Sequence, residues 1–509
     1  MSSQTDASED GTVEEQATMQ ERHESVAAEV LPDSTGLYVG GEFVDAAAAE
    51  TFDTVDPATG EVLTDVARGR EADVDRAVSA AWSAFEETWS GYAAGRRQRV
   101  LTAVADTIED HTEELAKLET LDNGKPISEA RVDVRGAAEQ FRYFAGVVRE
   151  NPGETMSEGS RYGQVIAEPY GVVGQVIQWN FPLLMASWKL APALAAGNCS
   201  VLKPAEQTPL SALRLAELID DVVPDGVVNV LPGYGEEAGE AVASHPDVRK
   251  IAFTGSTAVG KRVMKNAAET VTDVTLELGG KSPVVVFPDV DVDRAVSLVS
   301  AAIFYNSGEC CEAGSRLFVH EAVADELLDG LAAAVESTTL GDPLDEETDL
   351  GPKVSREQVE RTVEYVEAAR EEGGEFLVDG GEPDDATLED GCYVEPTLVE
   401  GLDHDSPPVQ EEIFGPVLTV FRWDDYDEMI ELANDVEYGL AGGVITDDVR
   451  QANEAARDIE AGYVWINSYH DLVPGLPFGG YKQSGIGREL SADTLDHYRR
   501  TKTINLSLR

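Results

Sequence analysis

The chain has 509 residues, enough for two or more domains, and its apolar content of 42% is typical of a globular protein with a substantial core. It carries 97 acidic and 38 basic residues, which gives a net charge of -59. A surface this negative repels nucleic acid and anionic membranes, so partners of these two classes are not expected.

The first residues of the chain predict no fold of their own. Residues 1–35 are rich in Ser, Thr, Glu and Asp and poor in aromatics, which predicts an acidic, disordered tail. The N-terminus lacks the basic and apolar regions of a signal peptide, and no apolar run approaches the ~18 residues that span a bilayer. We therefore expect a cytoplasmic protein.

The next hundred residues predict a hairpin and three helices. Residues 36–44 contain a Gly-Gly turn between two short apolar runs, which is typical of a hairpin. Apolar side chains at helical spacing predict one helix from Val74 to Trp89 and a second from Leu101 to Leu118. An Asn-Gly pair and a Pro end the second helix at residues 121–126, and a third helix runs to about residue 149.

Residues 170–288 alternate between short apolar runs and helical patterns. The runs, read as strands, are residues 172–177, 199–202, 227–231 and 250–253, and the helices between and after them are 181–196, 209–223, 235–243 and 258–269. This alternation predicts a doubly wound parallel sheet, whose ligands bind at the carboxyl ends of the strands.

A second alternating series runs from residue 284 to about 480 and predicts a second α/β domain. The chain ends in a strand-like stretch, residues 503–508, with nothing after it to pair with. Together with residues 162–168 it is expected to form an edge hairpin that augments the sheet of a partner.

Two of the four cysteines, Cys310 and Cys311, lie on a Gly-containing turn between an Ala-rich helical run and a strand. A thiol in such a place can reach a cleft, but its pKa of about 8.5 means that the fold must help to ionise it. From the residues alone, both could instead be small buried hydrophobes, as we expect for Cys199 and Cys392. Four cysteines are too few for a disulfide framework.

Other polar residues follow predicted strands at the same edge of the sheet. Gly255 and Ser256 join a strand to a helix N-terminus, where backbone N–H groups can bind phosphate. Lys203 and Glu206 follow another strand, and an acid there can accept hydrogen bonds from both ribose hydroxyls. Each of these has a plain alternative, since a strand–helix turn or a solvated loop charge needs no ligand.

These segments, with those around Asn180, Glu277 and residues 411–416 and 477–489, resemble the aldehyde dehydrogenase superfamily over residues 36–509. The resemblance implies that Cys311 is the nucleophile and Cys310 a neighbour. It implies that the Asn180 amide and the Cys311 N–H form an oxyanion hole. Glu277 becomes the general base. Lys189 and Glu489 match residues that relay protons to it.

The resemblance also implies a coenzyme site and no metal. Its residues are Trp179, Lys203, Glu206, Gly255, Ser256, Glu412 and Phe414. Lys203 and Glu206 would hold the adenosine ribose, so NAD is favoured over NADP. Glu412 would bind the nicotinamide ribose and Phe414 would pack on the coenzyme.

The implied fold is the α/β aldehyde dehydrogenase fold. It has a Rossmann-like NAD-binding domain in residues 36–150 and 170–281 and a catalytic α/β domain in residues 282–481. Residues 151–169 and 492–509 form a small β oligomerisation arm, which implies a homodimer or homotetramer.

The implied reaction is the NAD-dependent oxidation of an aldehyde to an acid. A CoA-acylating dehydrogenase, a thiol esterase without a redox step and a non-catalytic relative are the alternatives. Glu277 argues against the first, because CoA-acylating relatives typically lack the base. The coenzyme motifs argue against the second, and the intact Cys311, Asn180 and Glu277 argue against the third.

The substrate is less well defined. Residues 467–473 look closest to betaine-aldehyde and ω-amino-aldehyde dehydrogenases, and Trp188, Trp465 and Tyr469 are candidates to face a quaternary ammonium. They are equally candidates for packing, and an aliphatic or aromatic aldehyde fits as well.

Two departures from the ordinary pattern carry expectations. The family usually has Gln where this chain has Glu309, and an acid that faces the thiol would raise its pKa, so we expect Glu309 to point away. The acidic residues are spread along the whole chain, as in proteins of salt-loving archaea, where molar salt shortens the Debye length to about 3 Å. An ordinary acidic protein is the alternative.

Overall fold

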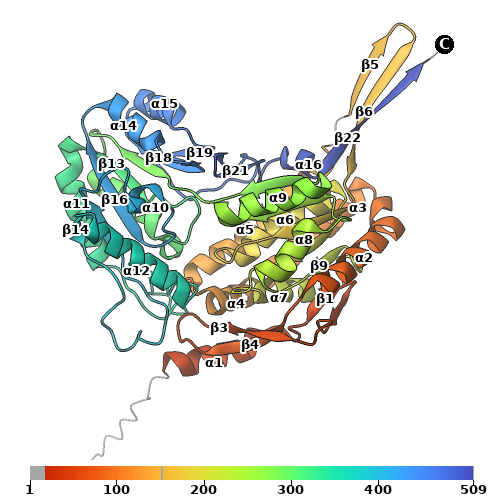
Figure 1. Ribbon diagram of the computed structural model, residues 1–509, viewed down its shortest axis with the longest axis horizontal. Coiled ribbons are helices and arrows are strands. Elements are labelled where there is room, and N and C mark those ends of the chain that lie inside the picture. Colours follow the sequence, from red (N-terminus) through yellow and green to blue (C-terminus); the bar gives the residue numbers. More distant parts are fainter. Residues whose placement is uncertain (1–17, 151–152, 508–509) are drawn as a thin grey trace, which may run out of the picture.

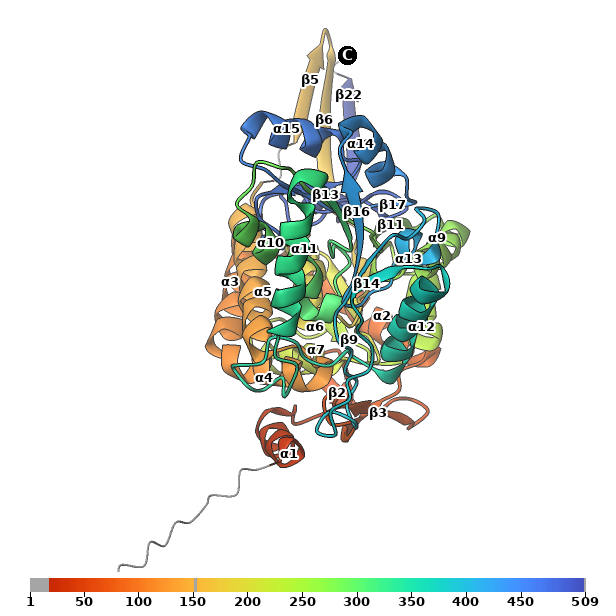
Figure 2. The same cartoon turned by 90° about the vertical axis from the view of Figure 1, so that its left-hand side faces the viewer.

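A computed structural model describes residues 18–150 and 153–507. Two sheets organise them into two lobes that lie side by side, and a narrow ribbon of three strands projects from one of the lobes (Figure 1). The view from the side shows this ribbon standing clear of both lobes (Figure 2).

The first lobe is built on an eight-stranded sheet whose central strands are parallel and buried on both faces, as Val-rich parallel strands require. Its order is β2 (Glu42–Val44), β1 (Leu37–Val39), β9 (Val228–Val230), β8 (Cys199–Lys203), β7 (Val172–Val176), β10 (Lys250–Thr254), β11 (Asp273–Glu277) and β21 (Gly485–Ile486). The predicted hairpin and parallel strands are confirmed. The last strand was not predicted, and it brings the C-terminal part of the chain back to this sheet.

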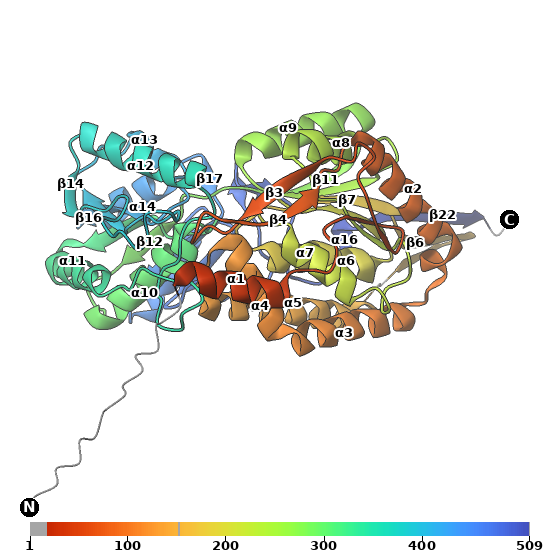
Figure 3. The same cartoon turned by 90° about the horizontal axis from the view of Figure 1, so that it is seen from below.

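Helices cover both faces of this sheet (Figure 3). One face carries α2 (Glu71–Glu87), α8 (Glu240–Ser244) and α9 (Thr257–Thr270), and the other carries α3 (Ala94–Asp110), α4 (Thr112–Asn123), α5 (Ile127–Val147), α6 (Pro182–Ala196) and α7 (Leu210–Leu218). A short turn of helix, Trp89–Gly91, follows α2, and a π-helical turn, Gly235–Gly239, precedes α8. Among the helices of the described ranges, none combines the length and apolar composition needed to cross a bilayer.

The predicted second helix is wrong in one respect, because it is two helices. His111 has φ -109° and ψ 21°, which ends α3 and starts α4. Leu115 and Leu118 are nevertheless buried as predicted, so the apolar spacing continues across the break and conceals it. Gly124 ends α4 with φ 94°, a left-handed conformation that suits glycine.

The second lobe is built on a seven-stranded sheet, parallel except for one edge strand. Its order is β14 (Glu375–Val378), β15 (Thr397–Glu400), β16 (Val417–Trp423), β13 (Arg316–His320), β12 (Pro283–Val286), β18 (Ala441–Ile445) and β19 (Tyr463–Ile466). Its helices are α10 (Val292–Phe304), α11 (Glu321–Glu336), α12 (Arg356–Glu371), α13 (Pro407–Gln410), α14 (Tyr426–Asn434) and α15 (Val449–Asp458). The predicted second α/β series is confirmed.

The projecting ribbon has the strand order β22, β6, β5. The predicted pairing is confirmed, because β22 (Arg499–Ser507) runs antiparallel to β6 (Arg161–Pro169) along its whole length. The third strand, β5 (Glu154–Glu158), was not predicted. The smaller elements are the hairpin of β3 (Thr51–Val55) and β4 (Val62–Ala67), the pair of β17 (Tyr438–Gly439) and β20 (Tyr481–Lys482), and the helix α16 (Thr494–His497).

The prediction of a disordered tail over residues 1–35 is wrong for its second half, and residues 1–17 lie outside the described residues. Residues 19–30 form α1 (Met19–Val30), which starts with a capping box made by Thr18 and Glu21. Ala27 and Val30 are buried in the main core. The acidic composition hid this helix because its buried face is narrow and contains a histidine.

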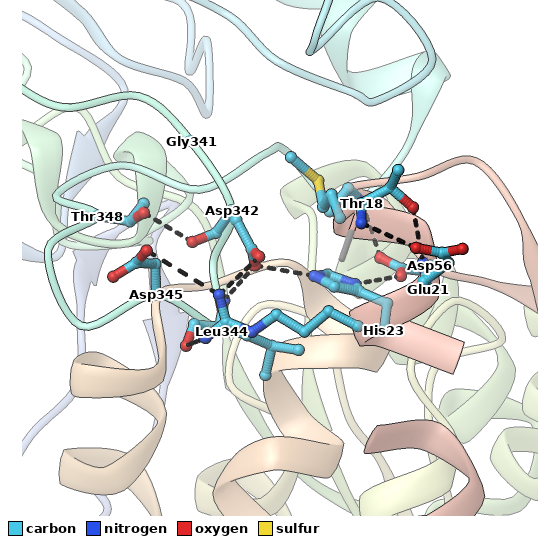
Figure 4. A network of polar contacts seen from close by, with 12 residues as sticks. Thr18, Glu21, His23, Asp56, Gly341, Asp342, Leu344, Asp345 and Thr348 are labelled. Atoms are coloured by element: carbon cyan, nitrogen blue, oxygen red, sulfur yellow. Dashed lines mark hydrogen bonds and ion pairs between the residues drawn. The ribbon is translucent and has the colours of Figure 1, made fainter. Parts of the chain in front are cut away.

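His23 joins α1 to both lobes (Figure 4). Its Nδ1 lies 2.5 Å from Asp56, in the turn after β3, and its Nε2 lies 2.9 Å from Asp342, in the loop after α11. The side chain is buried. Burial lowers the pKa of His23, but the hydrogen bonds to Asp342 and Asp56 outweigh it and raise this pKa to about 9.

We expect the stabilisation from His23 to depend on pH. A histidine whose pKa is higher in the folded protein (about 9) than in the unfolded chain (6.5) contributes its full stabilisation below pH 6.5 and loses it as the pH rises through 9. His23→Ala should therefore destabilise the protein by on the order of 3 kcal/mol more at pH 6 than above pH 9, measured by urea unfolding. His111→Ala, which removes a more exposed ion pair with Glu114, serves as the control and should change little. An equal cost of His23→Ala at both pH values would contradict the prediction.

Candidate active site

A cavity of about 300 Å³ lies at the carboxyl ends of β7, β8 and β10 and is closed on its far side by residues of the second lobe. Cys311 lines it. So does every residue predicted to hold the coenzyme, namely Trp179, Lys203, Glu206, Gly255, Ser256, Glu412 and Phe414. Residues far apart in the chain therefore meet where a doubly wound sheet places its ligands.

A strained loop presents Cys311 to the cavity. After α10 the chain passes through left-handed conformations at Asn306 (φ 50°), Ser307 (φ 52°) and Gly308 (φ 72°). A side chain at Gly308 would collide with the Gly415 backbone at 2.4 Å, so only glycine fits. The strain is typical of a loop whose geometry serves a site.

The two neighbouring cysteines have different surroundings. Cys310 is buried, and its Sγ points back to the carbonyl of Tyr305 at 3.5 Å. Cys311 is only partly buried and lines the cavity. Burial, and next the carboxylate of Glu312, raise the pKa of the Cys311 thiol well above its usual range. The resting thiol is therefore protonated, and its reaction needs a base.

Glu309 points away from the thiol, as expected. Its Oε1 lies 3.1 Å from Nζ of Lys353, and its Oε2 accepts a hydrogen bond from the N–H of Val354 at 3.3 Å. Burial raises the pKa of Glu309 to about 7, and the Lys353 ammonium opposes that rise. The acid that stands in place of the usual Gln is thus paired with a buried Lys side chain.

Asn180 lies against the nucleophile loop. Its Nδ2 donates to the backbone carbonyl of Glu309 at 2.8 Å, which leaves the second amide hydrogen for a ligand. The backbone carbonyl of Asn180 accepts hydrogen bonds from Lys125 Nζ at 2.9 Å and Asn306 Nδ2 at 3.0 Å. Within the described residues, the N–H of Cys311 has no hydrogen-bond acceptor. Among the described residues, one hydrogen of the Asn180 amide and the N–H of Cys311 are therefore without an acceptor.

Glu277, Lys189 and Glu489 gather at the end of β11. β21 pairs with β11 and so brings the C-terminal segment beside Glu277. Lys189 and Glu489 form a buried ion pair. Neither carboxylate oxygen of Glu277 has a hydrogen-bond partner among the described residues. Burial, and next the charge of Glu489, raise the pKa of Glu277 well above its usual range.

The remaining cavity residues fit a dinucleotide. Lys203 Nζ lies 2.7 Å from Glu206 Oε2, so a carboxylate and an ammonium stand together at the cavity wall. Ser256 caps α9, whose N-terminus opens onto the same wall. The rings of Trp179 and Phe414 meet edge to face with centroids 5.2 Å apart.

Glu412 is held tightly within this site. A side chain at Gly279 would collide with the Glu412 carboxylate at 2.2 Å, and the N–H of Gly280 donates to Oε1 of Glu412 at 3.0 Å. The close packing explains why a Gly-Gly pair stands here. Burial raises the pKa of Glu412 to about 7.

The sequence of residues 43–504 matches the family model described as "Aldehyde dehydrogenase family". The chain belongs to this family. It is 47% identical over 482 residues to "Putative aldehyde dehydrogenase DhaS" of Bacillus subtilis (strain 168), an alignment that covers 94% of this chain and 97% of that protein.

Solved structures of aldehyde dehydrogenases resemble this chain in fold and sequence, which agrees with its family membership. The NAD⁺ complex of an aldehyde dehydrogenase from Bacillus cereus is 44% identical, with a TM-score of 0.92 over 95% of this chain and 98% of that one. Betaine aldehyde dehydrogenase from Staphylococcus aureus, solved with NAD⁺, is 40% identical, with a TM-score of 0.93 over 96% and 98%. The predicted fold and enzyme class are confirmed, and the relatives named here are bacterial.

Two residues of this aldehyde dehydrogenase were not predicted: Glu312, which contacts the thiol, and His470, which contacts Glu312. Sγ of Cys311 donates to Oε2 of Glu312 at 3.0 Å, and Oε1 of Glu312 lies 3.3 Å from Nδ1 of His470. An acid directly after the nucleophile was visible in the sequence. The histidine, 158 residues further on, carried no local signal that connects it to Glu312.

The three aromatics predicted to face a quaternary ammonium are packed against other groups. Trp465 donates from Nε1 to the Asp471 carbonyl at 3.0 Å, and its ring lies 4.5 Å from that of Tyr469. Tyr469 donates to the Glu312 carbonyl at 2.7 Å. Trp188 packs edge to face on Phe478 at 5.5 Å. Trp188 and Trp465 are buried, which favours the packing alternative for these two.

Proposed function

We propose that the protein is an NAD-dependent dehydrogenase that oxidises a small aldehyde to its carboxylic acid through a covalent adduct on Cys311. The observation that carries the proposal is that Cys311, and not Cys310, lines the cavity formed by the dinucleotide-fitting residues.

In the first step the sulfur of Cys311 bonds to the carbonyl carbon, and the carbonyl oxygen becomes an alkoxide. Among the described residues, the Asn180 amide and the Cys311 N–H each have a hydrogen without an acceptor, and we assign both to this oxygen. Covalent capture is needed because an aldehyde has no alkoxide from which hydride can be expelled.

NAD, when bound, supplies the acceptor for that hydride, and Cys311 is left as a thioester. Glu206 and Lys203 are assigned to its adenosine ribose, Ser256 and the α9 N-terminus to its phosphates, and Glu412 to its second ribose. The Bacillus cereus and Staphylococcus aureus relatives with NAD⁺ bound support this choice of coenzyme.

Hydrolysis of the thioester is assigned to Glu277. Its buried carboxylate, whose pKa is raised mainly by burial, is a strong base once it is deprotonated. Glu277 does not itself line the cavity, but its backbone carbonyl accepts a hydrogen bond from the N–H of the cavity residue Gly255 at 3.1 Å. The proton of the attacking water goes to Glu277. The buried pair of Lys189 and Glu489, which faces it, gives the proton a route away from the site.

We expect Glu206→Gln to weaken NAD and to admit NADP. Loss of a charged acceptor for the ribose hydroxyls should lower kcat/KM for NAD by about 10- to 100-fold, since such hydrogen bonds contribute roughly 1.5–3 kcal/mol. Loss of its negative charge should raise kcat/KM for NADP. Glu411→Gln is the matched control, because Glu411 binds Tyr365 and does not line the cavity. An unchanged ratio of the two coenzymes in Glu206→Gln would contradict the prediction.

Betaine aldehyde is one proposed substrate, supported by the similarity to the Staphylococcus aureus enzyme of that name. Because Trp188 and Trp465 are buried by packing, a small aliphatic or aromatic aldehyde is proposed on equal terms.

We further propose a cytoplasmic enzyme adapted to high salt, supported by the free cysteines and by the net charge of -59. A homodimer or homotetramer joined through the arm is supported by the exposed Met156, Ile504 and Leu506 on its edge strands.

The test is a panel of these aldehydes with NAD or NADP, in low and molar KCl, followed by NADH absorbance and by mass analysis of the products. We expect NADH and free carboxylic acid without added CoA, and higher activity in molar KCl. Formation of acyl-CoA only when CoA is present would favour the acylating alternative. Ester hydrolysis without any aldehyde oxidation would favour the esterase.

A further inference from the structure

The polar group in contact with the Cys311 sulfur is the carboxylate of Glu312. The thiol donates to Oε2 at 3.0 Å, and Glu312 is buried. Glu277 has no hydrogen-bond partner among the described residues, so it does not hold the thiol proton in this conformation. Of the two acids, Glu312 is therefore the one placed to receive it.

His470 keeps Glu312 in its charged form. Nδ1 of His470 faces Glu312 Oε1 at 3.3 Å, and Nε2 faces the Ala301 carbonyl at 3.1 Å. Both ring nitrogens thus face acceptors, an arrangement that a doubly protonated imidazolium satisfies best. Burial raises the pKa of Glu312, but the hydrogen bond and charge of His470, together with the hydrogen bond from Cys311, outweigh it and hold this pKa below its usual range.

We propose that Glu312, held by His470, is the base that takes the thiol proton as Cys311 attacks the aldehyde, which leaves Glu277 to act on water alone. The assignment rests on the proposed role of Cys311. The S–H bond breaks and its proton passes to Oε2, while the S–C bond forms and the carbonyl π electrons move to oxygen. When water later breaks the thioester, the same proton returns from Glu312 to the departing sulfur.

The titratable groups around Cys311 and Glu312 favour Glu312 as the base and His470 as the cation that pairs with it. The titratable groups that act on Cys311 or Glu312 from the elements packed around them are Cys310, Glu412, Tyr469, His470 and Asp133. Among these, only His470 can carry a positive charge. Within the described part of the chain, the sulfur therefore has a nearby acceptor for its proton, and none of the charged groups that set its pKa is a cation.

The two roles that Glu312 could have predict opposite effects of Glu312→Gln. If Glu312 only repels a thiolate, removing its charge lowers the thiol pKa and makes Cys311 react faster. If Glu312 takes the proton, removing it makes Cys311 react more slowly. Iodoacetamide alkylation of Cys311 in the full-length protein, followed by mass spectrometry from pH 5 to 9, distinguishes the two.

We expect Glu312→Gln to slow alkylation at pH 7 by about 10²–10⁴-fold, the usual effect of losing a general base. Its rate should rise steeply with pH where the rate of the wild type is nearly constant. The burst of NADH should slow by a similar factor. Glu309→Gln is the matched control, because Glu309 is also a buried acid, lies three residues before Glu312 and binds Lys353, and it should leave this pH profile in place.

A second variant keeps the test decisive if Glu312→Gln does not fold. His470→Ala removes the cation and leaves the carboxylate, so the low-pH decline of alkylation should move to higher pH as the pKa of Glu312 rises. Faster or unchanged alkylation in Glu312→Gln, or an unmoved decline in His470→Ala, would overturn the proposal. Cys311→Ala separates this failure from failure of the proposed function, because only the latter would leave aldehyde oxidation active without the thiol.

Discussion

Cys311→Ala should lower kcat/KM for aldehyde oxidation by at least about 10⁴-fold, because without the sulfur no alkoxide forms from which hydride can leave. The remaining donors, Asn180 and the N–H of residue 311, stabilise an oxyanion only after a nucleophile has added. Added aldehyde should therefore give no NADH above the rate without enzyme. Binding of NAD, followed by quenching of tryptophan fluorescence, should persist because the rest of the cavity wall is intact.

Cys310→Ala is the matched control for this variant. Its thiol is buried against the Tyr305 carbonyl and does not line the cavity. It should keep kcat/KM within a few fold and lose on the order of 1 kcal/mol of stability through a small cavity in the core. If Cys310→Ala were inactive and Cys311→Ala active, the assignment of the two thiols would be reversed.

The sequence predicted best where local patterns and the family order coincide. Strands such as β7 and β8 are continuous apolar runs, and the residues that follow them, Lys203 and Glu206 among these, gather at one edge of the sheet. This convergence follows from parallel topology, so it needed no knowledge of side-chain packing. The arm was predicted for a similar reason, because an unpaired terminal strand needs an edge.

The sequence predicted least where a single buried contact joins distant segments. The acidic composition of α1 concealed a helix that is fixed by His23 between Asp56 and Asp342. The orientation of Glu309 was predicted because an acid at a thiol is unfavourable, but its partner, Lys353, gave no sign in the sequence. His470 reaches Glu312 from a loop in the left-handed conformation (φ 57°), which no periodicity reports.

The site contains buried acids with pKa values held in opposite directions, and this difference is what allows a division of work. Burial holds the pKa of Glu277 up, whereas His470 holds the pKa of Glu312 down. At neutral pH Glu312 is therefore ionised and has a free site for a proton, whereas Glu277 resists ionisation. Pairs of acids separated in this way commonly take different roles in one reaction. Removing each acid should therefore impair a different half of the cycle.

Glu277→Gln should impair the second half. The substitution keeps the shape of the side chain, so the thiol, the oxyanion donors and the coenzyme residues remain in place. The first turnover should still release about one equivalent of NADH per enzyme, at nearly the wild-type rate. Steady-state turnover should fall by roughly 10²–10⁴-fold because no base activates water.

Stopped-flow absorbance measures the burst, and mass spectrometry of the quenched enzyme should find the acyl group on Cys311. Hydroxylamine, which needs no general base to attack a thioester, should restore part of the turnover. In the wild type, kcat should decline as the pH falls through the raised pKa of Glu277, because the protonated acid cannot act as a base. Glu312→Gln is the counterpart variant, since it should slow the burst. A Glu277→Gln enzyme that turns over at the wild-type rate, or that shows no burst and no acyl group, would show that hydrolysis does not depend on this carboxylate.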